Sequence, residues 1–217
     1  MSDYQINNPA TGEVEATYPT ATEQDIQNAI EQADSAYQDW RQVSLNERST
    51  ILHKIADIYL ERQDELARIV VAEIYRYYAD NAEQLLAPHT IDVDTGSASV
   101  EKLPVGALLG IMPWNYPHYQ VARFAAPNFM AGNTIILKHA PQCPKTAEVI
   151  GDILKDAGLP DGVYNNVFAT NEQAATIIED DRVQGVSLTG SERAGQAVAK
   201  IAGGALKKVV LELGGSD

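Results

Sequence analysis

Short apolar segments alternate with amphipathic stretches through the second half of the chain, and this alternation constrains the fold more than any other feature. Predicted strands cover residues 107–112, 134–137, 163–168, 183–188 and 209–213. Between them lie helical patterns over 120–130, 146–157, 171–178 and 191–202, with Pro127 expected to kink the first helix or to cap a second segment. Short apolar strands separated by helices predict βαβ units and a Rossmann-like α/β fold, a parallel sheet with helices on both faces.

The first half of the chain has a different pattern, which is helical up to about Leu86. Two capping boxes, Thr22 with Asp25 and Ser44 with Glu47, predict helix starts, and we expect a break near Arg62. Polar and apolar residues then alternate around a Gly-containing turn, which predicts a β-hairpin. We therefore divide the chain into a helical region at 1–88, a hairpin at 89–102 and a parallel α/β core at 103–217.

Composition excludes several classes of function. The formal net charge is −14, which argues against nucleic acid and against an anionic membrane surface as partners. No apolar run is long enough to span a membrane, and the first residues have neither the basic nor the apolar part of a secretory signal. The single cysteine, Cys143, excludes an internal disulfide and a Cys-rich metal site. We expect a cytoplasmic protein with no bound metal.

Because ligands bind at the carboxyl ends of parallel strands, the residues that follow each strand are the candidates for function. Asn115 follows the first strand, where its amide N–H groups suit a developing oxyanion, or where it bonds its own backbone in a turn. Lys138 follows the second strand and either reaches the ribose of a nucleotide or caps the strand in solvent. The neighbouring His139, before Ala-Pro, is expected to be structural.

Two further strand ends carry candidate residues. Gly190 and Ser191 open a helix, where a phosphate could approach the backbone and the helix dipole, and Gly195 would let that helix pack close to the sheet. As an alternative, this is an ordinary strand-to-helix turn. Glu212 interrupts the last apolar strand, and burial there would raise its pKa and suit it to proton transfer, unless it only bonds backbone N–H groups.

The ordered set of these motifs resembles the aldehyde dehydrogenase superfamily, and within it the succinate-semialdehyde dehydrogenases. The motifs are Asn8–Glu13, Pro113-Trp114-Asn115, Lys138 with His139-Ala140-Pro141, Thr189-Gly190-Ser191 with Gly195, and Leu211-Glu212-Leu213-Gly214-Gly215. The resemblance implies a partial aldehyde dehydrogenase fold, in which this chain is a truncated NAD(P)-binding domain and the catalytic domain is absent.

The resemblance also implies a reaction, in which an aldehyde such as succinate semialdehyde is oxidised to the acid with NAD or NADP. A cysteine thiolate attacks the carbonyl, a hydride passes to the cofactor, and water releases the acid. By resemblance, Asn115 is an oxyanion donor and Glu212 is the general base. The cofactor-binding residues implied are Ile111, Met112, Pro113, Trp114, Lys138, Gly190, Ser191, Gly195 and Leu213. Family members also associate through a hairpin like the one at 89–102, which predicts a homo-oligomer.

Three departures from the family pattern qualify these expectations. The nucleophilic cysteine of the family lies beyond the Glu-Leu-Gly-Gly motif, and Cys143 stands where the family has no catalytic thiol, so we expect this chain alone to be inactive. A family segment is missing near Val71, which predicts disturbed packing there. Pro141 stands where the family often has an acidic residue that binds both hydroxyls of the adenosine ribose. Without that carboxylate a 2′-phosphate is less strongly excluded, so NADP is as plausible as NAD. The alternatives are a non-catalytic dinucleotide-binding module and a non-functional gene remnant.

Overall fold

The computed structural model describes residues 4–62 and 69–214. Its centre is a five-stranded sheet in the order β7-β6-β5-β8-β9, and every neighbouring pair is parallel. The strands are β5 (Ala107–Ile111), β6 (Thr134–Lys138), β7 (Tyr164–Val167), β8 (Val183–Gly190) and β9 (Lys208–Leu213). All five residues of β6 and the first four of β5 are buried, which is the pattern of strands covered on both faces. The predicted Rossmann-like α/β fold is confirmed.

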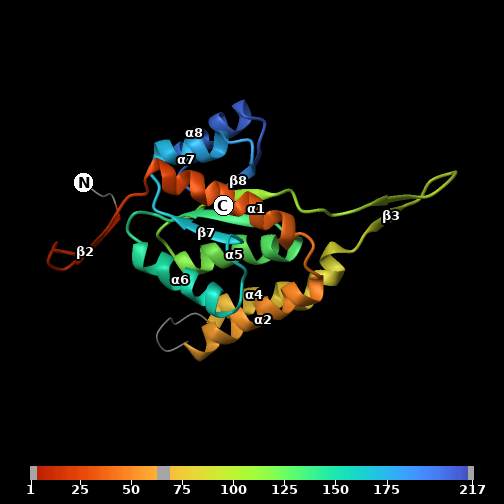
Figure 1. Ribbon diagram of the computed structural model, residues 1–217, viewed down its shortest axis with the longest axis horizontal. Helices are drawn as coiled ribbons and strands as arrows, with labels where there is room; N and C mark the ends of the chain where they lie inside the picture. The colour runs from red at the N-terminus through yellow and green to blue at the C-terminus, as the bar shows by residue number, and fades with distance from the viewer. Residues whose placement is uncertain (1–3, 63–68, 215–217) are drawn as a thin grey trace.

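Helices cover both faces of this sheet, and each face has its own apolar core (Figure 1). One face packs against α1 (Glu23–Trp40), α7 (Asn171–Glu179) and α8 (Glu192–Gly204). The other face packs against α5 (Pro117–Ala131) and α6 (Pro144–Asp156), with α2 (Leu45–Glu61) and α4 (Ile69–Leu86) behind them. Pro127 lies inside α5, which runs as one helix rather than two segments.

The helical first half is confirmed from α1 onward. Both predicted capping boxes are present, at Thr22 with Asp25 and at Ser44 with Glu47. The described part of α2 ends with Arg62 as its C-cap, where a break was expected. The part of the expected break that falls after Arg62 lies outside the described residues.

The disturbed packing predicted near Val71 is not seen. Val71, Ala72 and Tyr75 of α4 are each no more than 1% exposed and belong to the same core as Leu52 and Tyr59 of α2. The two helices make one of the most extensive contacts in the molecule. The prediction was wrong because helix pairing depends on the apolar faces that remain, and both faces here are intact.

Residues 4–18 are not helical, contrary to the division at 1–88. β1 (Tyr4–Asn7) pairs antiparallel with β2 (Val14–Tyr18). Between them Asn8 accepts hydrogen bonds from the N–H groups of Ala10 and Thr11 through its Oδ1 atom, and Gly12 has a φ of +76°. An Asn-Pro turn that ends in a left-handed glycine is a hairpin signal, and it was present in the sequence.

The predicted hairpin at 89–102 is confirmed as β3 (His89–Ile91) and β4 (Ala98–Val100), which pair antiparallel. Figure 1 shows it as a long arm on the side opposite the β1–β2 hairpin. In the part of the chain that the structure describes, both strands pair only with each other, and Ile91, Val93 and Val100 are 40–48% exposed. No helix in the described residues is long and apolar enough to cross a membrane.

Candidate active site

A cavity of about 430 Å³ opens at the carboxyl edge of the sheet, where the strand order reverses between β5 and β8. This reversal is the place where open parallel sheets bind their ligands. The loops after β5, β8 and β9 meet there, as the sequence predicted for Asn115, Ser191 and Glu212. The lining residues are Pro113, Trp114, Asn115, Gln120, Arg123, Thr189, Gly190, Ser191, Glu212, Leu213 and Gly214.

The loop after β5 presents Asn115 to this cavity. Its side chain makes no hydrogen bond within residues 4–62 and 69–214, so the alternative of an amide bonded to its own backbone is wrong. The next residue, Tyr116, has a left-handed φ of 52° and precedes Pro117, the first residue of α5. This turn changes the chain direction sharply at the strand end, and it leaves both amide N–H groups of Asn115 available to a ligand.

The turn after β8 has the features of a phosphate site. Ser191 is the N-cap of α8, and its Oγ accepts a hydrogen bond of 3.3 Å from the N–H of Ala194. A Cβ on Gly190 would meet only Leu188, at 3.5 Å, so the cavity side of this glycine is open. A Cβ on Gly195 would lie 2.6 Å from Leu213, which shows that α8 packs closely on β9 as predicted.

Glu212 lies in the cavity, but its strand is not buried. β9 forms an edge of the sheet, five of its six residues are exposed, and the Glu212 side chain is 53% exposed. The burial on which its predicted role rested is therefore absent. Among residues 4–62 and 69–214, its carboxylate bonds no backbone N–H group either. Instead Oε2 lies 3.5 Å from a guanidinium nitrogen of Arg123.

Arg123 is a site residue that the sequence analysis missed. It lies on α5, and its guanidinium donates hydrogen bonds of 3.1 Å to Gln120 and to Thr189 Oγ1, besides the contact with Glu212. It therefore connects α5 with the ends of β8 and β9. The only sequence signal was a lone cation on the helix that follows the Trp114–Asn115 loop.

Lys138, Ile111 and Met112 do not line the 430 Å³ cavity. Lys138 is only 6% exposed, and its ammonium lies 5.9 Å from the ring centroid of Tyr4, so a solvated strand cap is excluded. Met112 is 3% exposed, and its N–H donates to the carbonyl oxygen of Lys138. Ile111 and Lys138 are the last residues of β5 and β6, and Met112 directly follows β5.

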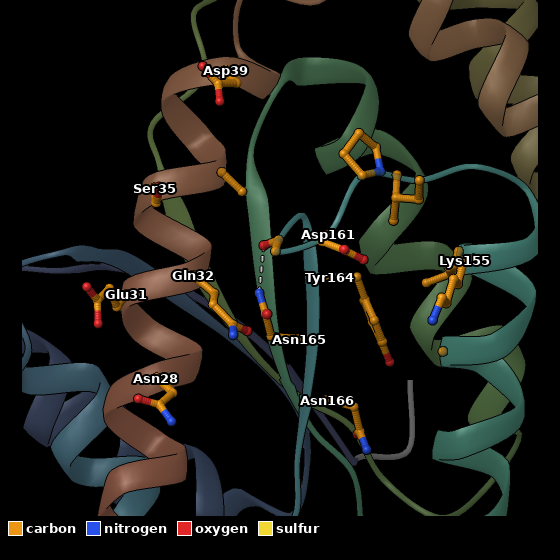
Figure 2. A pocket seen from close by; sticks show the side chains of 16 residues that line it. Asn28, Glu31, Gln32, Ser35, Asp39, Lys155, Asp161, Tyr164, Asn165 and Asn166 are labelled. Atoms are coloured by element: carbon orange, nitrogen blue, oxygen red, sulfur yellow. Dashed lines mark hydrogen bonds between the residues drawn. The ribbon is translucent and has the colours of Figure 1, made fainter.

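Other cavities also border the sheet. One of about 500 Å³ lies between α5 and the β8–β9 side of the sheet and shares Arg123, Thr189 and Glu212 with the first. The largest, about 870 Å³, lies between α1, α6 and β7 and contains no residue singled out by the sequence (Figure 2). We regard the smaller cavity at the strand reversal as the site, because position in the fold decides where ligands bind and size does not.

His139 and Cys143 are structural, as the sequence predicted. His139 is fully buried, which lowers its pKa to about 3, and its Nε2 lies 3.3 Å from the hydroxyl of Tyr164. It is therefore neutral at physiological pH. Cys143 precedes α6, and burial raises the pKa of its thiol, which disfavours the nucleophilic thiolate. Within the described residues, no group of three His, Cys, Asp or Glu side chains could hold a metal ion.

The fold and the site can now be compared with known proteins. A model of the aldehyde dehydrogenase family matches residues 1–74 and 70–217. The chain belongs to the aldehyde dehydrogenase family. The two matched segments meet at residues 70–74, which is where the sequence predicts a missing segment.

Individual relatives agree with this assignment. The chain is 46% identical to the succinate-semialdehyde dehydrogenase [NADP(+)] of Deinococcus radiodurans over 227 residues, which cover 97% of this chain and 48% of that protein. It is 39% identical to the succinate semialdehyde dehydrogenase [NAD(P)+] Sad of Escherichia coli K12, over 97% of this chain and 49% of the relative. The chain thus spans about half the length of the curated relatives it matches.

A solved structure shows the same arrangement. The succinic semialdehyde dehydrogenase of Streptococcus pyogenes, in complex with NADP+, superposes with a TM-score of 0.95 at 38% identity. The superposition covers 99% of this chain and 51% of that one. The family and its partial fold, as predicted, are therefore confirmed.

Proposed function

We propose that this chain forms the dinucleotide-binding part of an aldehyde dehydrogenase that oxidises succinate semialdehyde with NADP or NAD. The observation that carries the proposal is the cavity at the strand reversal, where Asn115, Ser191 and Glu212 come together from three different strand ends. The relatives named above are succinate-semialdehyde dehydrogenases that use NADP or either cofactor, which supports the same choice here.

The residues of the cleft fit a dinucleotide. The open space at Gly190 and the N-terminus of α8 suit a diphosphate, because backbone N–H groups and the helix dipole favour negative charge there. Trp114 and Leu213 line the cavity and offer apolar surface to the cofactor. Lys138 serves the adenosine ribose, and the absence of a carboxylate at Pro141 leaves room for a 2′-phosphate. When bound, the cofactor supplies a hydride acceptor.

The remaining side chains would act on the substrate. The Asn115 amide donates hydrogen bonds to the carbonyl oxygen as negative charge develops on it. Glu212 accepts a proton from the water that releases the acid. Arg123 offers its guanidinium to the distal carboxylate of the substrate, since Arg binds carboxylates with two parallel hydrogen bonds. An aldehyde that carries a carboxylate at its other end, such as succinate semialdehyde, thus fits this cleft better than an uncharged aldehyde does.

The nucleophile is a separate matter. Cys143 is the sole cysteine of the 217 residues, and its thiol is buried at the start of α6. We therefore propose that these 217 residues bind the cofactor and do not turn over aldehyde on their own. Formation of reduced nicotinamide from succinate semialdehyde by the purified chain would contradict this part of the proposal.

Titration calorimetry with NADP+ and NAD+ tests cofactor binding. Gly190→Ala is tolerated by the fold, because its Cβ meets only Leu188 at 3.5 Å. The added methyl fills space that the ligand would occupy, and overpacking of about 1–3 kcal/mol corresponds to about 5- to 150-fold weaker binding. Gly203→Ala lies at the opposite end of α8, where an added Cβ meets nothing within 4 Å, so it is the control and should bind as wild type does. Equal affinities in all three proteins would refute the site.

A dinucleotide-binding module without chemistry is a second candidate, favoured by the burial of Cys143. Such a module would bind the dinucleotide but would not turn over aldehyde, because no catalytic cysteine joins it. Absence of both binding and a cooperative thermal transition would instead indicate a non-functional remnant. A full-length assembly with a reactive thiol near Glu212 would exclude both alternatives.

We also propose that the 89–102 hairpin mediates self-association and that the protein is cytoplasmic. The exposed Ile91, Val93 and Val100 give the hairpin an apolar surface, and its strand edges are open to pairing. Ile91→Lys should shift the protein toward monomer in analytical ultracentrifugation. A wild-type chain that is monomeric at all concentrations would contradict the proposal.

A further inference from the structure

The β1–β2 hairpin docks on the carboxyl ends of β6 and β7, beside Lys138, the residue to which the proposed function assigns the ribose. The Tyr4 hydroxyl is shared between the carbonyl oxygens of His139, at 3.1 Å, and Ala169, at 3.0 Å. Gln5 donates its N–H to the carbonyl oxygen of Pro141 at 3.2 Å. A segment from the start of the chain thus joins two strand ends more than 130 residues away.

The ring of Tyr4 has a second role, which concerns Lys138. Tyr4 is 1% exposed and Lys138 is 6% exposed, so the ammonium and the ring meet away from solvent. The separation of 5.9 Å between Nζ and the ring centroid lies within the range of a cation–π contact, which is stronger where water is excluded. A flexible four-carbon side chain is thereby held at one position.

We propose that Tyr4 is a positioning residue that orients Lys138 toward the ribose 2′ position and so favours NADP over NAD. The inference rests on the proposed function. A held ammonium contributes most to a ligand that carries a 2′-phosphate, because the phosphate bears full negative charge and a hydroxyl does not. Pro141, which Gln5 contacts, supplies no competing carboxylate at this end of the cleft.

The ring and the hydroxyl of Tyr4 can be separated by mutation. Tyr4→Ala removes the ring, and we expect about ten-fold weaker NADP+ binding with less than about a three-fold change for NAD+. Tyr4→Phe keeps the ring and loses only the bonds to His139 and Ala169, so it should lower the melting temperature and retain the NADP preference. Titration calorimetry with both cofactors measures the ratio of affinities.

Tyr18 provides the matched control. It pairs with Tyr4 across the hairpin, and its ring contacts Phe168, as the ring of Tyr4 does. Tyr18→Ala should loosen the same hairpin without changing the ratio of the two affinities. If Tyr18→Ala and Tyr4→Ala weaken both cofactors equally, or if Tyr4→Ala strengthens NADP+ binding, the proposal is overturned.

Acetylation of Lys138 gives a readout that needs no cofactor. With a limiting amine-reactive reagent and peptide mass spectrometry, Tyr4→Ala should raise the labelling of Lys138 several-fold, while Tyr4→Phe and Tyr18→Ala should leave it near the wild-type level. Unchanged labelling in Tyr4→Ala overturns the orientation of Lys138. If the wild-type chain binds neither cofactor, the proposed function fails and cofactor selection fails with it, whereas the labelling still decides the orientation.

Discussion

The two edges of the sheet, β7 and β9, are opposite in composition and in cover. β7 has the polar sequence Tyr164-Asn165-Asn166-Val167, yet two of its four residues are buried, between α1 and α6. β9 is largely apolar, since four of its six residues are Val or Leu, yet five of the six are exposed. A strand's own hydrophobicity therefore did not decide which edge was covered.

Hydrogen bonds satisfy Asn165 on the covered edge, although Asn166 Oδ1 is buried without a partner among the described residues. The Asn165 amide (Figure 2) donates to the carbonyl oxygens of Gly162 and Ile135. The Tyr164 hydroxyl lies 3.3 Å from Nε2 of His139. Polar groups buried with partners cost little, whereas unpaired ones cost a great deal. On the open edge, Val209, Val210 and Leu213 are 36–55% exposed, and exposed apolar side chains that gather along one strand are typical of a contact area.

The largest difference between the edges is expected at their glycines. A Cβ on Gly162, which has a φ of +83°, would lie 2.7 Å from the backbone oxygen of Gln32, whereas on Gly195 it would meet the movable end of Leu213. Gly162→Ala should therefore destabilise by about 3 kcal/mol, and Gly195→Ala by less than about 1 kcal/mol. Urea denaturation measures both. Equal losses would mean that the β9 edge is as rigid as the β7 edge.

A matched pair of valines tests the same contrast in the strands. Val167 of β7 is 5% exposed and Val210 of β9 is 55% exposed. Val167→Ala should cost about 2 kcal/mol of unfolding free energy, since it removes buried methyl groups and leaves a cavity. Val210→Ala should cost less than about 0.5 kcal/mol. A larger loss at Val210, measured by the same denaturation, would show that this edge is covered in solution.

Acid should weaken the β7 side through His139. Burial lowers its folded pKa to about 3, below its unfolded value of 6.5, so this residue takes up a proton only on unfolding. Its contribution is complete above pH 6.5, and stability should fall by about 1.4 kcal/mol per pH unit from there toward pH 3. His139→Gln should flatten this slope, while His89→Gln in the exposed hairpin should not. An unchanged slope in His139→Gln would rule out His139 as the source.

The smallest effect is expected at the β9 edge, from the Arg123–Glu212 contact. Its side chains are 38% and 53% exposed, and pairs of this kind contribute about 0.2–1 kcal/mol. A double-mutant cycle with Arg123→Met and Glu212→Gln should give a coupling in this range that declines with added salt. Coupling that is insensitive to salt would show that the pair is shielded from solvent.

Local signals explain what could be predicted from the sequence. The capping boxes at Thr22 and Ser44, and the buried β5 and β6, depend on neighbouring residues and were found. The meeting of Asn115 and Glu212 also followed, because parallel strands end at one edge of a sheet.

Tertiary context explains what could not be predicted. The exposure of Glu212 depends on which strand lies at the edge of the sheet, and the sequence of a single strand does not determine the strand order. Arg123 enters the site only because α5 returns over β8 and β9. Lys138 is covered by Tyr4, a residue 134 positions earlier, whose hairpin was not foreseen. Each of these depends on contacts between segments that are distant along the chain.

The close pairing of α2 with α4 has a practical consequence for protein engineering. Relatives align over more residues than this chain possesses, and the family match breaks at 70–74, yet Leu52, Tyr59, Val71 and Tyr75 remain in one core. The break lies in the first turns of α4 (Ile69–Leu86), so a change of chain length there has left the sheet intact, together with the cleft, whose residues lie on other elements. Peptide tags or fluorescent reporters attached to this helix pair should therefore leave the cleft functional, because none of the cleft residues lies on α2 or α4.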